Sequence, residues 1–381
     1  MLSRPGPAQH LQFALVVAVL ATSSARADER EGPVAVEEEG KAQARDHRFG
    51  FAVVPGPTYS PALGWGIMVI PMAMYDLVPS DRLSPASTTA GFGFYTENES
   101  WGAGLFQKLY LDEDHWRLKG GGGFAHVNQR FYGVGADASG SFVGMTMEAV
   151  FALAEGLYQV FPSGYAGLII WFRQSRFEGV DANADAVLDA AGLNRQWVHA
   201  ITPGLRFDYD TRDVQTTPRR GLYVFNTLRG ASTALGSSQS YARFSTYYAQ
   251  FIAVDSEARH VLAWNTAVEA GFGDVPFEEY PDIAGNKALR GYIKGEYTDK
   301  NMLSAQVEWR WNVWWRLGLT AFGGLGTVFP SWGRLDEGTW LPSGGAGLRF
   351  TILPERGMNA RLDFAWGKDG GNFYFSVGEA F

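Results

Sequence analysis

The 381-residue chain contains 47 Gly, 13 Trp, 16 Tyr, 26 Phe and no Cys, and 19% of its residues are charged. This aromatic content excludes a disordered protein, and the lack of Cys excludes a disulfide scaffold, a thiol enzyme and a Cys-ligated metal site. The formal net charge of −8 is unlike the basic character of nucleic-acid-binding proteins, so we expect no nucleic-acid partner.

The first segment has the pattern of a cleaved secretory signal. Arg4 precedes an apolar stretch over residues 11–20, and residues 25–27 (Ala-Arg-Ala) put small side chains where a signal peptidase reads. The stretch is short for an uncleaved membrane anchor, which is the alternative. The sequence therefore predicts a signal peptide over residues 1–27, followed by a disordered, acidic periplasmic tail over residues 28–47.

The rest of the chain shows a hydrophobic period of two. Polar Gln306 and Glu308, for example, alternate with apolar Val307 and Trp309. Alternate residues of a strand point to opposite faces, so such a segment has one wet and one apolar face. The charge-free stretch 49–75 carries four Pro and four Gly, which disfavours a membrane-spanning helix there.

A soluble β-sandwich also alternates, but three features favour a membrane barrel. Aromatic residues recur on the apolar face near strand ends, as in interfacial girdles. Charges on the other face suit a water-filled lumen. The chain also stops on an aromatic residue inside a predicted strand, which leaves an open edge unless that strand pairs with the first. We therefore expect an all-β fold, a transmembrane antiparallel β-barrel over residues 48–381.

Turn and loop signals divide this barrel into sixteen strands, an even number that suits a bacterial barrel. The predicted strands are 49–59, 62–73, 85–95, 99–110, 115–127, 140–153, 159–177, 196–210, 220–231, 240–255, 258–272, 301–313, 316–329, 341–352, 358–367 and 372–381. The longest gap without alternation, residues 273–300, predicts a functional loop.

Three motifs stand out, one after the eighth strand, one in the long gap and one at the carboxyl end. Their residues are Asp210, Thr211, Arg212, Asp213, Pro218 and Gly221; Leu289, Arg290, Gly291 and Tyr292; and Phe373, Phe375, Val377, Gly378 and Phe381. In their order and spacing they resemble the BamA/TamA family of outer-membrane barrels, the bacterial surface antigen superfamily, over about residues 48–381. The resemblance implies a bacterial outer-membrane location and makes the third motif a carboxyl-terminal assembly signal.

The resemblance also implies a latch between the sixth extracellular loop and the barrel wall. Arg290 would fold into the lumen and pair with acids of strands twelve and thirteen. Glu308 matches the first acid, and its parity independently places it on the wet face. The alternative interpretation of Arg290 is an exposed loop arginine beside a turn glycine. The alternative interpretation of Asp210, Arg212 and Asp213 is a solvated charge cluster at a strand end.

The strand-thirteen motif departs from the family pattern, which is Phe-x-Asp-x-Gly. The residues at the three specified positions are Phe322, Gly324 and Gly326, so glycine stands where the second acid is expected. One acceptor of the latch arginine is therefore missing. Asp363 on strand fifteen is a candidate substitute if its height in the lumen matches.

The implied function is insertion of outer-membrane proteins or polypeptide export, without ATP. Outer-membrane lipid and unfolded outer-membrane or secreted client proteins would be the partners. Relatives that handle clients carry periplasmic POTRA domains, for which a 20-residue tail leaves no room, so we expect a barrel-only member, with a separate POTRA-type partner or another role. The alternative function is a passive pore or structural barrel, because fold does not fix activity.

The sequence does not favour an enzyme. The histidines of the predicted barrel are scattered over different strands, without a local Ser partner or a metal-binding spacing. They are His115, His126, His199 and His260. We expect no catalytic residues, no metal and no cofactor.

Overall fold

The computed structural model describes residues 49–381, apart from residues 61–62, 79, 82–83, 85, 136–141, 194, 215–216, 286 and 354–357. The side chains of residues 52, 54–60, 352–353, 358 and 375–377 also lie outside this description. The predicted signal peptide (1–27) and acidic tail (28–47) lie outside the described residues as well.

The fold is all-β, with sixteen antiparallel strands in one sheet, as the sequence predicts. The strands are β1 (Gly50–Ser60), β2 (Gly64–Tyr75), β3 (Ser87–Thr96), β4 (Trp101–Leu111), β5 (Trp116–Phe131), β6 (Val143–Phe161), β7 (Gly164–Gly179), β8 (Val198–Asp210), β9 (Gly221–Ala231), β10 (Tyr241–Ala253), β11 (His260–Gly273), β12 (Asn301–Trp314), β13 (Leu317–Phe329), β14 (Leu341–Leu353), β15 (Met358–Gly367) and β16 (Gly370–Val377).

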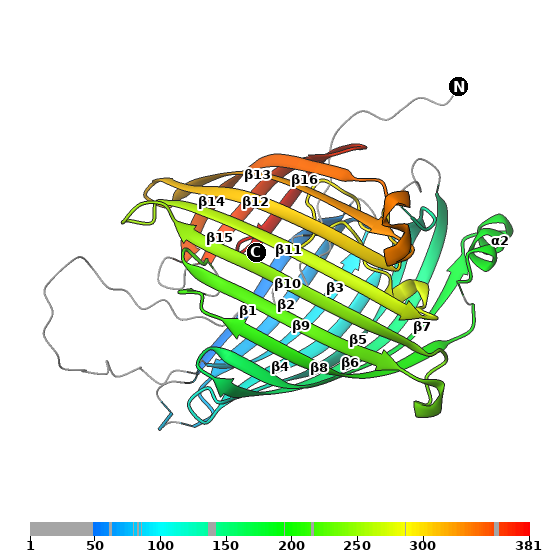
Figure 1. Ribbon diagram of the computed structural model, residues 1–381, viewed down its shortest axis with the longest axis horizontal. Helices are drawn as coiled ribbons and strands as arrows, with labels where there is room; N and C mark the ends of the chain where they lie inside the picture. The colour runs from blue at the N-terminus through cyan, green and yellow to red at the C-terminus, as the bar shows by residue number, and fades with distance from the viewer. Residues whose placement is uncertain are drawn as a thin grey trace, which may run out of the picture.

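The sheet follows chain order and curls into a barrel-shaped wall of tilted strands (Figure 1). Each strand pairs with the next, from β1 through to β16. Among the residues that the structure describes, no ladder joins β1 to β16, so these two strands are the edges of the sheet.

The two faces of the wall differ as the period of two predicts. On β12, Gln306 and Glu308 are buried on the inner face, whereas Val307 and Trp309 are 47% and 56% exposed on the outer face. Polar groups therefore line the lumen and apolar groups face outward. This arrangement is that of a barrel in lipid, in which the lumen is the wet side.

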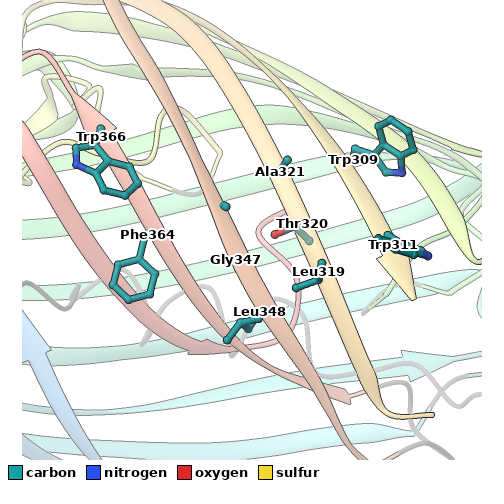
Figure 2. Close-up of a pocket in the computed structure, with 10 residues that line it drawn as sticks. Trp309, Trp311, Leu319, Thr320, Ala321, Gly347, Leu348, Phe364 and Trp366 are labelled. Atoms are coloured by element: carbon teal, nitrogen blue, oxygen red, sulfur yellow. The ribbon is translucent and has the colours of Figure 1, made fainter. Parts of the chain in front are cut away.

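An apolar groove of about 590 Å³ runs over the outer face of β12 to β15 (Figure 2). Its floor includes Ala321 on β13 and Ala346 on β14, which are paired neighbours. Trp309 flanks the floor on β12, and Phe364 and Trp366 flank it on β15. Small residues between aromatic ridges make this part of the outer wall concave.

The turn between β6 and β7 differs from its predicted position. The sequence places it at residues 154–158, but β6 continues to Phe161 and the turn is at residues 162–163. The reason is that Glu155 lies inside the strand with its side chain on the inner face, where it pairs with Lys119. A charge that faces the lumen does not end a strand.

The described residues also contain short helices that are not part of the sheet. They are α2 (Ala182–Ala190) between β7 and β8, and the 3₁₀ turns η1 (Thr233–Leu235), η2 (Phe277–Glu279) and η3 (Trp332–Glu337). Asp181 caps α2 by accepting a hydrogen bond from the Ala184 N–H. No helix in the described part of the chain is long and apolar enough to cross a membrane.

The predicted last strand, 372–381, is wrong at its end. β16 stops at Val377, and the chain turns at Gly378, whose φ of 88° favours glycine. Glu379 then pairs with Arg349 inside the barrel at 2.8 Å. Phe381 packs against Phe251 of the inner face. The last residues turn inward because the lumen offers a cation to Glu379 and an apolar contact to Phe381.

Candidate functional site inside the barrel

Loop six, residues 274–300 between β11 and β12, packs inside the barrel. Leu289, Arg290 and Tyr292 at its tip are all buried. The loop holds its own shape because the Leu289 N–H donates to the Ile283 carbonyl at 2.9 Å. A loop whose tip is held in this way can present one side chain at a fixed place on the inner wall.

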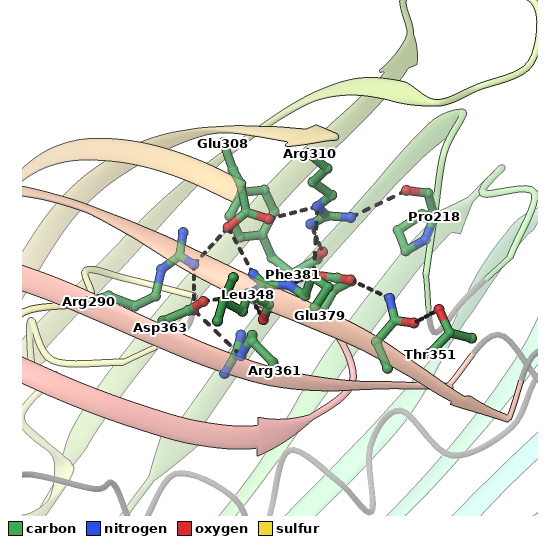
Figure 3. A network of polar contacts seen from close by, with 12 residues as sticks. Pro218, Arg290, Glu308, Arg310, Leu348, Thr351, Arg361, Asp363, Glu379 and Phe381 are labelled. Carbon is green, nitrogen blue, oxygen red and sulfur yellow. Dashed lines mark hydrogen bonds and ion pairs between the residues drawn. The ribbon is translucent and has the colours of Figure 1, made fainter. Parts of the chain in front are cut away.

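That side chain is Arg290, which meets two carboxylates of the wall (Figure 3). Its Nη1 lies 2.7 Å from Glu308 Oε2 on β12 and 2.9 Å from Asp363 Oδ2 on β15. Its guanidinium carbon lies 3.4 Å from the centre of the Phe322 ring. All three charged side chains are fully buried, so water does not solvate their charges. The opposite charges of Arg290 and the two carboxylates compensate one another instead.

The pair belongs to a larger buried network. Arg310 donates to Glu308 at 2.7 Å. Arg349 donates to Asp363 at 2.6 Å and to Glu379 at 2.8 Å. Figure 3 shows these contacts converging from β12, β14, β15 and the inward-turned carboxyl end. Loop six is therefore tied to the last strands of the sheet through shared charges.

The glycines of the strand-thirteen motif make room for the loop. A Cβ on Gly324 would lie 2.7 Å from Leu289 Cδ2, and a Cβ on Gly326 would lie 2.8 Å from Ile283 Cδ1. The position of the missing acid is therefore filled by the loop itself. Asp363 supplies a second carboxylate to Arg290 from β15 instead.

Main-chain contacts hold the loop against β16. The Gly291 N–H donates to Tyr374 Oη at 2.6 Å, and Asn372 Nδ2 donates to the Gly291 carbonyl at 2.6 Å. Tyr292 Oη donates to the Pro342 carbonyl at the start of β14. Gly291 has a φ of 106° and a Cβ there would meet the β15 main chain at 2.8 Å, so only glycine fits.

Comparisons with known proteins identify the family to which this barrel belongs. The model of the Omp85 superfamily domain matches residues 125–381. The chain belongs to the Omp85 superfamily. No curated protein matches it. The BamA barrel of Haemophilus ducreyi, solved without POTRA domains 1–3, is similar in structure, with 14% identity and a TM-score of 0.60 over 87% of this chain and 69% of that one.

Two CdiB structures are also similar to this Omp85 barrel. That from Acinetobacter baumannii has 12% identity and a TM-score of 0.54, over 87% of this chain and 59% of that one. That from Escherichia coli has 10% identity and a TM-score of 0.58, over 88% and 68%. These likenesses show the fold, and with the family they make the chain an outer-membrane β-barrel.

The described residues of the motif between β8 and β9 of the Omp85 barrel are linked by hydrogen bonds. Arg212 donates to both oxygens of Asp210, at 2.8 and 2.7 Å, and lies over the Tyr223 ring. Asp213 Oδ1 accepts N–H bonds from residues 214, 219 and 220. Gly221 has a φ of 96°. Arg212 and Asp210 are largely buried, whereas Asp213 is exposed, so the description of a solvated charge cluster fits only Asp213.

The other predicted residues of this turn, and those of the carboxyl end, make the following contacts. Thr211 Oγ1 accepts from the Leu222 N–H at 3.0 Å, and the Pro218 carbonyl accepts from Arg310 at 3.3 Å. The turn therefore contacts the arginine network of loop six. Phe373 packs on Phe364 of β15, whereas the Phe375 and Val377 side chains lie outside the described residues.

Sequence reasoning missed four members of the network, Arg310, Arg349, Arg361 and Glu379. The three arginines share the parity of inner-face residues in their strands, which was the available signal. Glu379 breaks the apolar parity of the last strand, which marks it as unusual in a segment expected to face lipid. His126, His199 and His260 lie on separate strands, and His115 lies in the turn before β5. The described residues hold no group of His, Asp and Glu side chains fit for a metal ion.

Loop six also holds two carboxyl groups with raised pKa values. Burial raises the pKa of Asp282 to about 6, although the Ala284 and Gly295 N–H groups bond to its carboxyl. Burial and the nearby Asp369 carboxylate raise the pKa of Glu296 to about 7. Both groups bind a proton more tightly in the folded loop than in an unfolded chain, where their pKa values are about 4.

We expect the stability of this Omp85 barrel to fall between pH 5 and pH 8. A raised acid contributes stability that is present below its unfolded pKa and is lost as the pH rises through its folded pKa. The loss is on the order of 2 kcal/mol. Thermal unfolding followed by circular dichroism at the two pH values measures it. The Asp282→Asn, Glu296→Gln double variant should lose much less stability over the same pH range. An equal loss in the variant and the wild type would contradict the assignment of the pH dependence to these two carboxyl groups.

Proposed function

We propose that this Omp85 barrel assists the insertion of outer-membrane proteins or the export of polypeptides. The observation that carries the proposal is the open edge of the sheet: among the described residues, β16 pairs only with β15, and β1 only with β2. An unpaired edge offers main-chain donors and acceptors to an incoming strand. A client strand would add at this edge and leave into the membrane once folded.

The fixed loop supports the proposal. If β1 and β16 separate to admit a client strand, the barrel keeps its shape only if the other strands are held in place. Arg290 links β12 to β15, and Gly291 links to β16, so the side of the sheet that ends at β16 is braced from within. Loop six would act as this latch, and it also fills lumen space that a passive pore would need.

The proposal includes several further assignments. Residues 1–27 would be a cleaved signal peptide and residues 28–47 a periplasmic tail. The turn at Asp210 to Gly221 would help shape the barrel end that it closes, and residues 373–381 would carry the assembly signal. The partners would be outer-membrane lipid, unfolded client proteins and a separate periplasmic protein of the POTRA type.

The test is the outer-membrane proteome of cells with and without this gene at matched growth. Loss of a defined set of other barrels or secreted proteins is the expected result, and restoration by the wild-type gene attributes it to this chain. A Gly323→Ala gene should restore the set equally, because this outward position leaves 3.6 Å to the nearest atom.

An unchanged proteome, in cells that have no second family member, would overturn the proposal and favour a passive pore or structural barrel. Conductance of the purified barrel in planar bilayers would then decide between those two. A steady, ungated conductance would identify a pore, whereas none would identify a structural barrel.

A further inference from the structure

A second charged cluster lies on the inner wall formed by β4 to β8, apart from the network around Arg290. Lys119 on β5 pairs with Glu155 on β6 at 2.6 Å, and Arg206 on β8 pairs with the other oxygen of Glu155 at 3.0 Å. Arg206 also pairs with Asp208 at 2.7 Å. Arg117 pairs with Asp114 at 2.6 Å. Each carboxylate of this wall is therefore already engaged by a cation.

Lys108 on β4 has no such partner. It lies directly opposite Lys119 in the ladder between β4 and β5, so its nearest paired neighbour carries the same charge. The residue is only 8% exposed, and no hydrogen bond or ion pair involves its ammonium among the described residues. The carboxylate that attracts it from a longer distance, that of Glu155, already pairs with Lys119 and Arg206. Like charges opposite each other destabilise a sheet, and a buried cation without a counter-ion is costly.

Loop six adds another cation that no carboxylate of the described residues pairs. The Lys287 ammonium lies 4.9 Å from the Phe225 ring centre and 5.2 Å from that of Tyr247, both on the inner face. Its own carbonyl accepts from Asn265 at 3.0 Å, which fixes the main chain. The next residue, Ala288, is buried, whereas the Lys287 side chain stays accessible to water, so it projects into lumen space.

Arg206 connects the two lysines. Its guanidinium carbon lies 5.1 Å from the centre of the Phe225 ring, the same ring that Lys287 contacts. It also shares Glu155 with Lys119, the residue opposite Lys108. The cluster contains five cations and three carboxylates, in a chain that is acidic overall. The surplus positive charge is thus local, and it faces the lumen.

We propose that the lumen between loop six and the wall of β4 to β8 binds an anion that carries phosphate or carboxylate groups. Lys108 and Lys287 supply the unpaired ammonium groups, and Lys119 and Arg206 add to the positive field. An ammonium is a compact donor of three hydrogen bonds and suits an oxyanion. The bound anion would offset the repulsion between Lys108 and Lys119 and join loop six to the wall opposite Arg290.

Inorganic phosphate and citrate are the probes, each compared with chloride at matched ionic strength and pH 7. The purified full chain, folded in detergent, should unfold several degrees higher in the presence of the bound anion. Lys108→Met and Lys287→Gln should each abolish most of this shift. Lys368→Gln, at an exposed lysine in the turn between β15 and β16, should keep it. The two probes tell which oxyanion the site prefers.

Lys108→Met also has an effect without any anion. In chloride it should unfold at a higher temperature than the wild type, because it removes an uncompensated buried charge. Equilibrium dialysis should give about one phosphate or citrate per wild-type chain. No difference between either probe and chloride in the wild type, or an equal shift in the wild type, Lys287→Gln and Lys368→Gln, would overturn the proposal. If Lys108→Met fails to fold, the Lys287→Gln variant still tests the proposal, because Lys287 lies in a loop and its substitution should not prevent folding.

Discussion

Arg290→Glu should lower the free energy of unfolding of the barrel by about 3–5 kcal/mol. The substitution removes the cation that Glu308 and Asp363 share and adds a third carboxylate in a place without water. Like charges at such distances cannot all stay ionised without cost. The loop should leave the wall, and the folded yield of the barrel should fall.

Urea unfolding in lipid vesicles and heat-dependent migration in gels measure this loss. The matched control is Arg259→Glu, the same substitution at an arginine whose side chain is 61% exposed and forms an ion pair with Glu257 alone among the described residues. Exposed pairs contribute little, so the control should change stability by less than about 1 kcal/mol. Equal stability of Arg290→Glu and the wild type would remove the latch from the proposed function.

Gly324→Asp, which restores the acid of the family pattern, should destabilise this barrel. A Cβ at Gly324 would lie 2.7 Å from Leu289 Cδ2 and 2.8 Å from the Ala305 carbonyl, so no side chain fits while the loop is in place. Overpacking of this kind costs about 1–3 kcal/mol. The added carboxylate would also bring a further negative charge to the inner wall, where Glu308 and Asp363 already pair with Nη1 of Arg290.

The control is the neighbouring glycine. Gly324→Ala should cost stability and loosen loop six, whereas Gly323→Ala points outward, meets its nearest atom at 3.6 Å and should be neutral or slightly stabilising. Urea unfolding of Gly324→Asp, Gly324→Ala and Gly323→Ala measures the order of their stabilities. Protection of the Leu289 amide against hydrogen exchange reports the loop directly. If Gly324→Asp is as stable as the wild type, Leu289 does not occupy this position.

The period of two was enough to predict the strand number and the faces. It works because a barrel wall has water on one side and lipid on the other, so each residue's polarity reports its side. The turn at residues 162–163 was misplaced because Glu155 is polar and yet lies inside a strand. Polarity alone does not distinguish a lumen-facing charge from one at a turn.

The partners of Arg290 were only partly predictable. Glu308 followed from its motif and parity, but the contact with Asp363 depends on the stagger between β12 and β15, which hydrophobic pattern does not encode. The inward turn after Val377 was also out of reach. It depends on Arg349 and Phe251, which are distant in sequence and meet the carboxyl end only in the folded barrel.

The inward turn of the carboxyl end limits how this protein can be labelled. The Phe381 main-chain oxygen accepts a hydrogen bond from Arg310 at 2.7 Å, and its ring lies against Phe251. Any peptide fused after Phe381 would begin within the lumen and displace contacts of the arginine network. An affinity tag or fluorophore is better inserted in the exposed loop at residues 232–240, where Leu235 is largely accessible and no latch contact is made.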